Sequence, residues 1–196
     1  MTDSADYCAT DFEFFIVESA GDGIFDGGLD GILGMSPYMQ EAGRNPNPFI
    51  TALYESGAID EAVVTFLLTE EPEASSITFG GIPEGLVDGD TRTFDIVLDD
   101  WWTVDITGIS YNGSSIKQSS VDKAIFDTGT SLIALPTDDF TTFANEMTAI
   151  GIPCDATACN RIEKCENFWP KMYPLEFTLS GQQFTLEPWQ YAWNAK

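Results

Sequence analysis

The residues best suited to chemistry lie in one short run, Asp127-Thr128-Gly129-Thr130-Ser131. A carboxylate can act as a general acid or base, and the amide and hydroxyl groups that follow Asp127 can donate hydrogen bonds to its oxygens. Such donors offset the cost of removing a carboxylate from water. Asp-Thr-Gly alone is a common turn sequence, however, so the residues around it must distinguish an ordinary turn from a prepared site.

Apolar residues flank this run on both sides, at positions 124–126 and 132–135. Continuous apolar segments of this length, bounded by turn residues, are typical of strands that are buried on both faces. The pattern therefore predicts that Asp127 lies on a turn between two short buried strands.

The composition excludes several other kinds of chemistry. The chain has no histidine, which rules out Ser-His and Cys-His catalysis and His-ligated metal sites. Its 32 acidic and 8 basic residues give a formal net charge of -24, and this charge repels nucleic acids and anionic membranes. The most apolar run, residues 62–69, is too short to span a bilayer. We expect no nucleic-acid partner, no membrane partner, no metal and no cofactor.

The four cysteines, Cys8, Cys154, Cys159 and Cys165, do not follow the paired Cys-x-x-Cys spacing of zinc sites. Disulfides are the alternative, with Cys154, Cys159 and Cys165 as the candidates, and they predict an oxidising compartment. The spacing alone does not determine which cysteines pair.

Periodicity and turn residues predict mainly strands with short helices. Helical spacing covers residues 48–56 and the stretch from an N-cap at Thr137 to Gly151. Asn112-Gly113 predicts a hairpin turn, and with Ser114 it also forms a glycosylation sequon that matters only in a secreted chain. The predicted strands are residues 11–18, 62–69, 75–81, 94–98, 101–109, 175–179 and 183–186.

Residues 124–132, Ala-Ile-Phe-Asp-Thr-Gly-Thr-Ser-Leu, resemble the second catalytic loop of pepsin-like aspartic endopeptidases. Segments at 29–35, 77–82, 102–113 and 175–193 resemble the same family in the same order. The resemblance implies an all-β fold, mainly β with short helices, in the bilobal β-barrel architecture of pepsin-like acid proteases, here incomplete. Residues 1–90 would be a remnant of the N-terminal lobe and the inter-lobe sheet, and residues 91–196 the C-terminal catalytic lobe without its last strands.

The resemblance also implies roles for the loop residues. Asp127 would be one member of a catalytic aspartate pair, Thr128 would brace the loop, and Gly129 would let the backbone approach the carboxylate. Thr130 and Ser131 would bind the substrate main chain.

Three further residues, Ile32, Leu33 and Gly34, would pass beside the catalytic loop of the first lobe. That loop and its flap would precede Met1, and the strand that closes the second lobe would follow Lys196. By the same resemblance, Cys165 would pair with a cysteine further downstream.

The implied activity is hydrolysis of peptide bonds in peptide or protein substrates, by a full-length monomer that is secreted or resides in a vacuole or lysosome. This chain alone would hold one catalytic aspartate, and we expect it to be incomplete and inactive. Two alternatives stay open: a catalytically inactive binding or inhibitor protein on the same fold, and a homodimer that brings two copies of Asp127 together.

Overall fold

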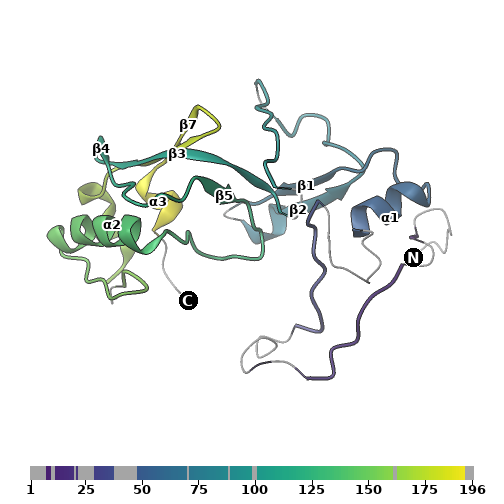
Figure 1. Ribbon diagram of the computed structural model, residues 1–196, viewed down its shortest axis with the longest axis horizontal. Helices are drawn as coiled ribbons and strands as arrows, with labels where there is room; N and C mark the ends of the chain where they lie inside the picture. Colours follow the sequence, from purple (N-terminus) through teal and green to yellow (C-terminus); the bar gives the residue numbers. More distant parts are fainter. Residues whose placement is uncertain are drawn as a thin grey trace. The chain divides into compact units, whose positions relative to one another are not determined.

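The structure is a computed structural model that describes residues 8–9, 12–19, 21, 29–37, 48–69, 71–87, 89–98, 101–160 and 163–192 (Figure 1). The chain forms two compact units. Unit 1 comprises residues 1–93 and 99–101, and unit 2 comprises residues 94–98 and 102–196. None of the described helices is long and apolar enough to cross a membrane.

The described residues of unit 1 form an α-helix and a hairpin with a short 3-10 helix between its two strands. Helix α1 (Phe49–Glu55) follows Pro48, whose fixed φ suits a helix start, and its buried face carries Ile50 and Leu53. Strands β1 (Val64–Leu67) and β2 (Ser76–Phe79) pair antiparallel, with the short helix η2 (Pro72–Ala74) between them. The predicted helix at 48–56 and the strands at 62–69 and 75–81 are confirmed.

The strand predicted at 11–18 is wrong. Residues 12–19 form no strand, and Phe14 and Ile16 are 77% and 84% exposed; residue 11 lies outside the described part of the chain. Aromatic and β-branched residues favour a strand only when a neighbouring strand and a packed face are available. Within the described residues, no strand pairs with this segment.

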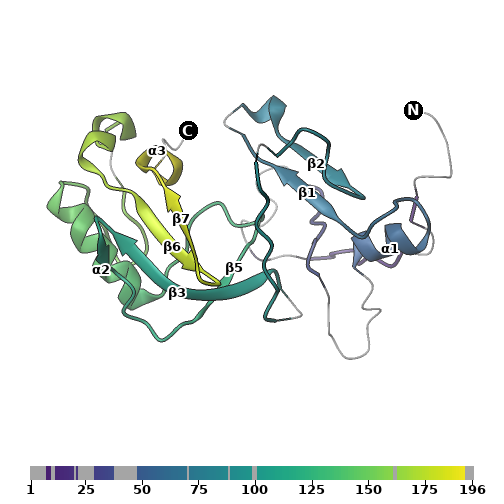
Figure 2. The same ribbon diagram turned by 90° about the horizontal axis from the view of Figure 1, so that it is seen from above.

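Unit 2 is built on an antiparallel sheet whose longest strand is β3 (Thr103–Tyr111) (Figure 2). Strand β3 pairs with β4 (Ser114–Ser115), β5 (Lys123–Ile125) and β6 (Leu175–Leu179), and β6 pairs with β7 (Gln182–Leu186). In the part of the chain that the structure describes, β7 pairs only with β6, so these strands do not close into a barrel.

The predicted hairpin turn at Asn112-Gly113 is confirmed, and a second tight hairpin of unit 2 turns between the predicted strands 175–179 and 183–186. Asn112 (φ 52°) and Gly113 (φ 70°) join β3 to β4, and Ser180 (φ 45°) and Gly181 (φ 79°) join β6 to β7. Positive φ at both central residues matches the right-handed twist of the flanking strands, and Asn and Gly tolerate it best. The residues predicted as a strand at 94–98 form none, although the Val97 N–H donates to the Thr103 carbonyl.

Helix α2 (Thr137–Ala149) packs on this sheet. Pro136 occupies the N-cap position, so Thr137 is the first helical residue and not the cap that the sequence suggests; Gly151 follows the helix with φ 89°. Short helices η3 (Cys165–Asn167), η4 (Trp169–Lys171) and α3 (Pro188–Tyr191) complete the unit.

The core of unit 2 lies between α2, the sheet and the short helices. The Tyr111 ring packs edge-on against Phe143 of α2, with ring centroids 5.4 Å apart. The Tyr111 hydroxyl accepts a hydrogen bond from the Tyr173 N–H, which satisfies the polar end of a buried ring. The most buried apolar side chains of this core are Val104, Ile106, Ile109, Tyr111, Ile116, Met147, Phe168, Met172, Leu175 and Leu179.

Candidate active site

Asp127 lies on a short turn just after β5, and its carboxylate is held from within that turn. The Gly129 N–H donates to Oδ1 at 2.9 Å, and the Thr130 hydroxyl donates to Oδ2. The Thr130 N–H donates to the Asp127 carbonyl at 3.2 Å and closes the turn. Both carboxylate oxygens therefore have a donor that is fixed by the local chain.

These donors stabilise the ionised form of the carboxylate. The Thr130 hydroxyl, followed by the Gly129 N–H, lowers the pKa of Asp127 below its ordinary value. Asp127 is therefore ionised at neutral and mildly acidic pH. An ionised carboxylate is the form that can accept a proton from water.

Gly129 allows the backbone to approach the carboxylate closely. A Cβ atom at this position would lie 3.1 Å from Asp127 Oδ1, which is closer than ordinary van der Waals contact. Any other residue at this position would have to displace the carboxylate or the turn. Glycine is therefore the residue that fits here without steric conflict.

Strand β5 fixes the place of this turn relative to the sheet. Ile125 pairs with Thr103 of β3, and the next N–H, that of Phe126, donates to the Trp102 carbonyl at 2.9 Å. Lys123, at the other end of β5, forms an ion pair with Asp105 at 2.7 Å. Asp127 is thus the first residue beyond a hydrogen-bonded ladder, which limits its movement.

The prediction that two buried strands enclose Asp127 is wrong. Only the first segment is a strand, and Ile125, Phe126, Leu132 and Ile133 are 48% to 64% exposed. An apolar run predicts burial only where other elements cover it. Among the described residues, β5 has the single neighbour β3, and residues 132–135 pair with no strand.

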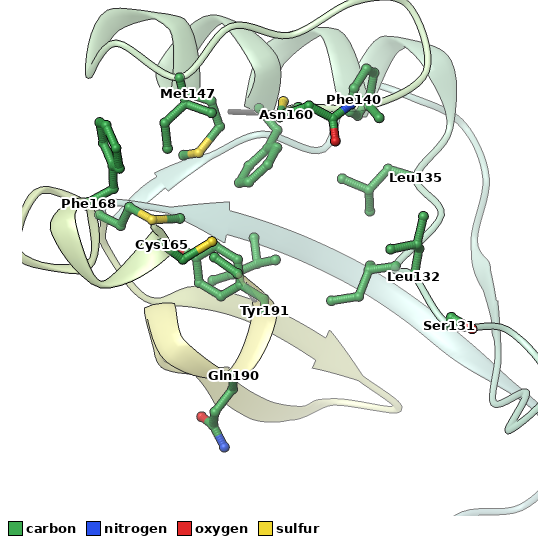
Figure 3. Close-up of a pocket in the computed structure, with 18 of the residues that line it drawn as sticks. Ser131, Leu132, Leu135, Phe140, Met147, Asn160, Cys165, Phe168, Gln190 and Tyr191 are labelled. Atoms are coloured by element: carbon green, nitrogen blue, oxygen red, sulfur yellow. The ribbon is translucent and has the colours of Figure 1, made fainter. Parts of the chain in front are cut away.

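Thr130 and Ser131 belong to the lining of a cavity of about 830 Å³ in unit 2. Figure 3 shows Ser131 at the edge of this cavity. Its walls come from α2, the loop after α2, η3 and α3, and most of its lining is apolar, including Leu132, Phe140 and Tyr191. The two hydroxyls therefore border an apolar space that could receive apolar groups.

Asp139 is a buried acid whose contacts the sequence does not reveal. It lies in the first turn of α2, is 1% exposed, and accepts hydrogen bonds from the Gln118 and Ser119 N–H groups at 2.6 Å and from the Ser119 hydroxyl at 2.7 Å. Burial raises the pKa of Asp139, but the hydrogen bonds from Ser119 and Gln118 and the charge of Lys117 outweigh it, so the pKa is lowered overall.

These hydrogen bonds of Asp139 therefore connect α2 to the loop that leads into β5. An acidic residue near a helix start is also explained by the helix dipole, so the sequence contained no signal that would identify this contact.

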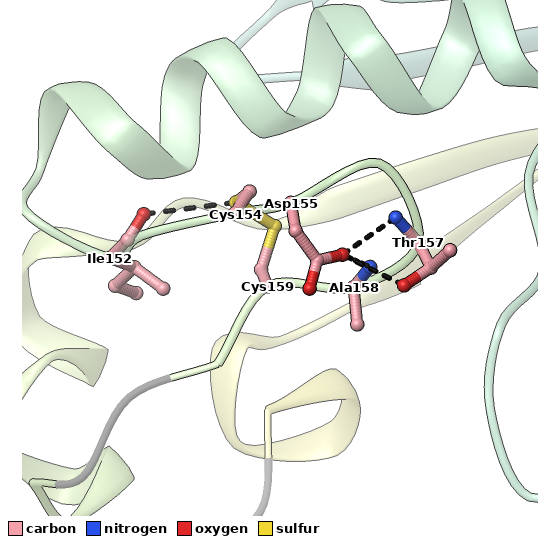
Figure 4. The surroundings of a disulfide bond; sticks show 6 residues. All are labelled: Ile152, Cys154, Asp155, Thr157, Ala158 and Cys159. Carbon is pink, nitrogen blue, oxygen red and sulfur yellow. Dashed lines mark hydrogen bonds between the residues drawn. A yellow bond between two sulfur atoms is a disulfide. The ribbon is translucent and has the colours of Figure 1, made fainter.

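Cys154 and Cys159 form a disulfide in the loop after α2 (Figure 4). Within this loop, the Asp155 carboxylate accepts hydrogen bonds from the Thr157 N–H at 2.7 Å and the Ala158 N–H at 2.8 Å. Cys165 is present as a thiol, and burial, with a smaller effect of the Glu166 charge, raises its pKa. No group of three or more His, Cys, Asp or Glu side chains in the described residues is arranged to hold a metal ion.

Ile32, Leu33 and Gly34 lie in unit 1, in an irregular segment where the two apolar side chains are 76% and 52% exposed. Asp127 lies in unit 2. The expected place of these three residues beside a first-lobe catalytic loop stays a prediction.

The fold has a known class. Over 87% of this chain and 51% of the other, it matches the crystal structure of an aspartic proteinase from Irpex lacteus, with a TM-score of 0.61 and 24% identity. This likeness defines the architecture as that of pepsin-like aspartic proteinases, mainly β with short helices, as the sequence analysis predicts.

The family is shown by the sequence itself. The family model described as "Eukaryotic aspartyl protease" matches residues 6–196, and the chain belongs to this family. Pepsin A of Bos taurus is 27% identical over 169 residues, covering 83% of this chain and 42% of the relative. Vacuolar protease A of Aspergillus fumigatus is 32% identical over 169 residues, covering 84% and 40%. The chain thus spans about two fifths of the length of these relatives.

Proposed function

We propose that this chain is part of an aspartic endopeptidase that hydrolyses internal peptide bonds, with Asp127 as one of its two catalytic aspartates. The observation that carries the proposal is the hydrogen bonding of Asp127. Both of its oxygens are held, by the Gly129 N–H and the Thr130 hydroxyl, and its pKa is lowered. Family membership supports the same reaction class.

In this mechanism the ionised Asp127 takes a proton from a water molecule as that water attacks the peptide carbonyl. A second, protonated aspartate donates its proton to the carbonyl oxygen, on which negative charge develops. Two carboxylates that share one proton have coupled pKa values, because like charges at such close range cannot both ionise freely; this behaviour is well known for aspartic proteases as a class. No other aspartate of this sequence precedes Thr-Gly or Ser-Gly, so the second aspartate would come from further sequence or another chain.

Peptide or protein substrates would bind along the turn and the adjacent cavity. The hydroxyls of Thr130 and Ser131 can bond to substrate main-chain groups, and the apolar lining of the cavity suits apolar side chains. Thr128 would brace the turn, although its hydroxyl makes no hydrogen bond among the described residues, and Gly129 would leave room for the substrate.

The other expected roles follow from the same proposal. Residues 1–90 would belong to the N-terminal lobe, with Ile32, Leu33 and Gly34 beside its catalytic loop, and residues 91–196 to the C-terminal lobe. The complete protein would act as a monomer in a secreted, vacuolar or lysosomal setting. The disulfide between Cys154 and Cys159 supports an oxidising compartment.

A second candidate is a non-catalytic binding protein on the same fold. The observation in its favour is the mainly apolar cavity beside the Asp127 turn, which suits peptide binding whether or not cleavage follows. Such a protein would bind peptides along the same turn and cavity but would leave them intact.

One assay distinguishes the endopeptidase from the binding protein. The full-length protein is incubated with an unfolded protein substrate from acidic to neutral pH, and the products are identified by mass spectrometry. An endopeptidase yields internal fragments, most rapidly at acidic pH. Peptide binding without any cleavage by the full-length protein would reject the endopeptidase and support the binding protein.

A further inference from the structure

We propose that Asn112 is an attachment site for an N-linked oligosaccharide. Asn112-Gly113-Ser114 is the only Asn-x-Ser/Thr sequence without a central proline in the chain. The hydrolytic chemistry proposed above has no use for this segment. A folded protein carries an oligosaccharide at a sequon only if the fold leaves room for it at the asparagine and the chain enters the secretory route, so both conditions need support from the structure.

Accessibility follows from the hairpin between β3 and β4. Asn112 is an exposed residue at the first turn position, and Ser114, the sequon hydroxyl, is also exposed. Figure 1 places this turn at an end of β3, next to the short strand β4. An oligosaccharide at this position would extend into solvent.

The fold tolerates a large group at this turn because the contacts that hold the hairpin in place do not involve the Asn112 side chain. Tyr111, the residue before Asn112, is 2% exposed and packs in the core, and β6 pairs with β3 from Ile106 to Tyr111. The turn itself depends on the positive φ values of Asn112 and Gly113, which involve only the backbone. Modification of the Asn112 side-chain amide therefore leaves both the core and the turn intact.

The compartment is supported by an independent observation. The Cys154–Cys159 disulfide indicates that the chain folds under oxidising conditions, as in the endoplasmic reticulum, where N-linked oligosaccharides are transferred. The exposed strand β4 pairs only with β3 among the described strands. A bulky hydrophilic group beside β4 would hinder edge-to-edge pairing with other chains.

The modification is a transfer from a lipid-linked oligosaccharide. The Asn112 amide nitrogen, Nδ2, forms a bond to the anomeric carbon of the first sugar, and the bond from that carbon to the phosphate of the donor breaks. The lipid pyrophosphate leaves, and the amide nitrogen loses one proton. No electrons are exchanged with another reactant.

The test uses the full chain, fused to a cleavable secretory leader and expressed in a eukaryotic host. Treatment with an amidase that hydrolyses the side-chain amide, and so releases the N-linked glycan and converts the modified asparagine to aspartate, is followed by electrophoresis and peptide mapping. Ser114→Ala removes the hydroxyl of the sequon but keeps the Asn-Gly turn. Ser115→Ala, at the adjacent exposed serine of β4, is the matched control.

We expect wild type and Ser115→Ala to lose apparent mass on treatment and to carry aspartate at position 112 afterwards, whereas Ser114→Ala shows neither change. Ser114→Thr should restore both. Because transfer occurs on the newly made chain, a variant that folds poorly still reports on the sequon. Wild type without a shift, or a shift that persists in Ser114→Ala, would overturn the proposal. Unmodified Asn112 in the protein purified from its natural source would also overturn it.

Discussion

At the residue scale, two donors within three positions of Asp127 lower the pKa of its carboxyl group. The Gly129 N–H and the Thr130 hydroxyl each bind one carboxylate oxygen, and both favour the charged form. In the proposed mechanism Thr130 would therefore be a positioning residue, which acts on the attacking water through Asp127.

Replacing Thr130 with valine should raise the pKa of Asp127 towards its ordinary value, because valine keeps the shape but removes the donor that lowers this pKa most. The titration of the Asp127 carboxyl carbon, followed by NMR, measures the change. Ser131→Ala is the matched control, since the structure gives Asp127 no hydrogen bond from Ser131, and it should leave the titration where it is. An unchanged Asp127 titration in Thr130→Val would contradict this account.

Local residues of the site were predictable and distant ones were not. Gly129 and Thr130 lie within three residues of Asp127, so the sequence alone suggests them as donors. The contact of Asp139 with Ser119 joins residues 20 positions apart and depends on how α2 packs. Only the folded chain reveals that contact.

At the element scale, Asp139 connects α2 to the loop before β5. Its carboxylate is buried and accepts three hydrogen bonds from Gln118 and Ser119. Removing this buried acceptor leaves three part-buried donors without their protein partner, and that loss is costly.

Asp139→Ala should therefore lower the free energy of unfolding by about 3 kcal/mol at neutral pH. Asp138→Ala, at the exposed neighbour on the same turn, should change it by less than about 0.5 kcal/mol. Urea denaturation of both variants and wild type provides the comparison. Equal effects of the two substitutions would refute the role of Asp139.

The same contact makes a prediction about pH. The pKa of Asp139 is lowered below 3.8 in the folded chain. Its contribution to stability is therefore present above pH 3.8 and is lost as the pH falls through the lowered pKa. The difference between wild type and Asp139→Ala should shrink in this acidic range, and a difference that grows on acidification would contradict the assignment.

The disulfide is a second local link, within the loop after α2. Cys154 and Cys159 are five residues apart, and closing so short a loop stabilises a fold by about 2 kcal/mol on the chain-entropy estimate. Replacing both cysteines with serine should lower the free energy of unfolding by that amount. Cys8→Ser, at an exposed cysteine outside the disulfide, is the control and should have little effect. A double variant as stable as wild type would show that the link adds nothing.

Elements with strong local signals were predicted best. α1, α2 and the β6–β7 hairpin follow helical spacing or turn chemistry, which act within a few residues. The segment 11–18 has strand-forming residues but forms no strand where the structure describes it. Strand formation requires pairing with a second strand that lies elsewhere in the sequence, and local residue types do not reveal that partner. The prediction that both segments flanking Asp127 are buried strands was wrong for the same reason.

At the scale of the whole molecule, charge is the dominant feature. A net charge of -24 on 196 residues opposes compaction at neutral pH. Salt should therefore raise the melting temperature at pH 7, since screening shortens the range of repulsion from about 8 Å at physiological ionic strength to about 3 Å at 1 M. Thermal unfolding at increasing sodium chloride measures the effect. A melting temperature that falls with salt would show that attractive ion pairs outweigh the repulsion.

The family could be predicted from the sequence, but the completeness of the catalytic centre could not. The Asp-Thr-Gly run and the segments around it are continuous in sequence, so a single chain displays them. A catalytic pair of aspartates, in contrast, depends on two residues that meet in space and need not be close in the sequence. This chain spans about two fifths of the length of its relatives, and it displays one candidate of that pair.

The most direct test of the account is the effect of Asp127→Asn on kcat/KM of the full-length protein for peptide cleavage. Asparagine keeps the size of the side chain but can neither ionise nor take a proton from water, so we expect a loss of about 10²-fold to 10⁴-fold. Asp138→Asn, at an exposed aspartate outside the turn, should retain wild-type kcat/KM. A full-length Asp127→Asn protein that cleaves peptides as fast as wild type would contradict the central claim.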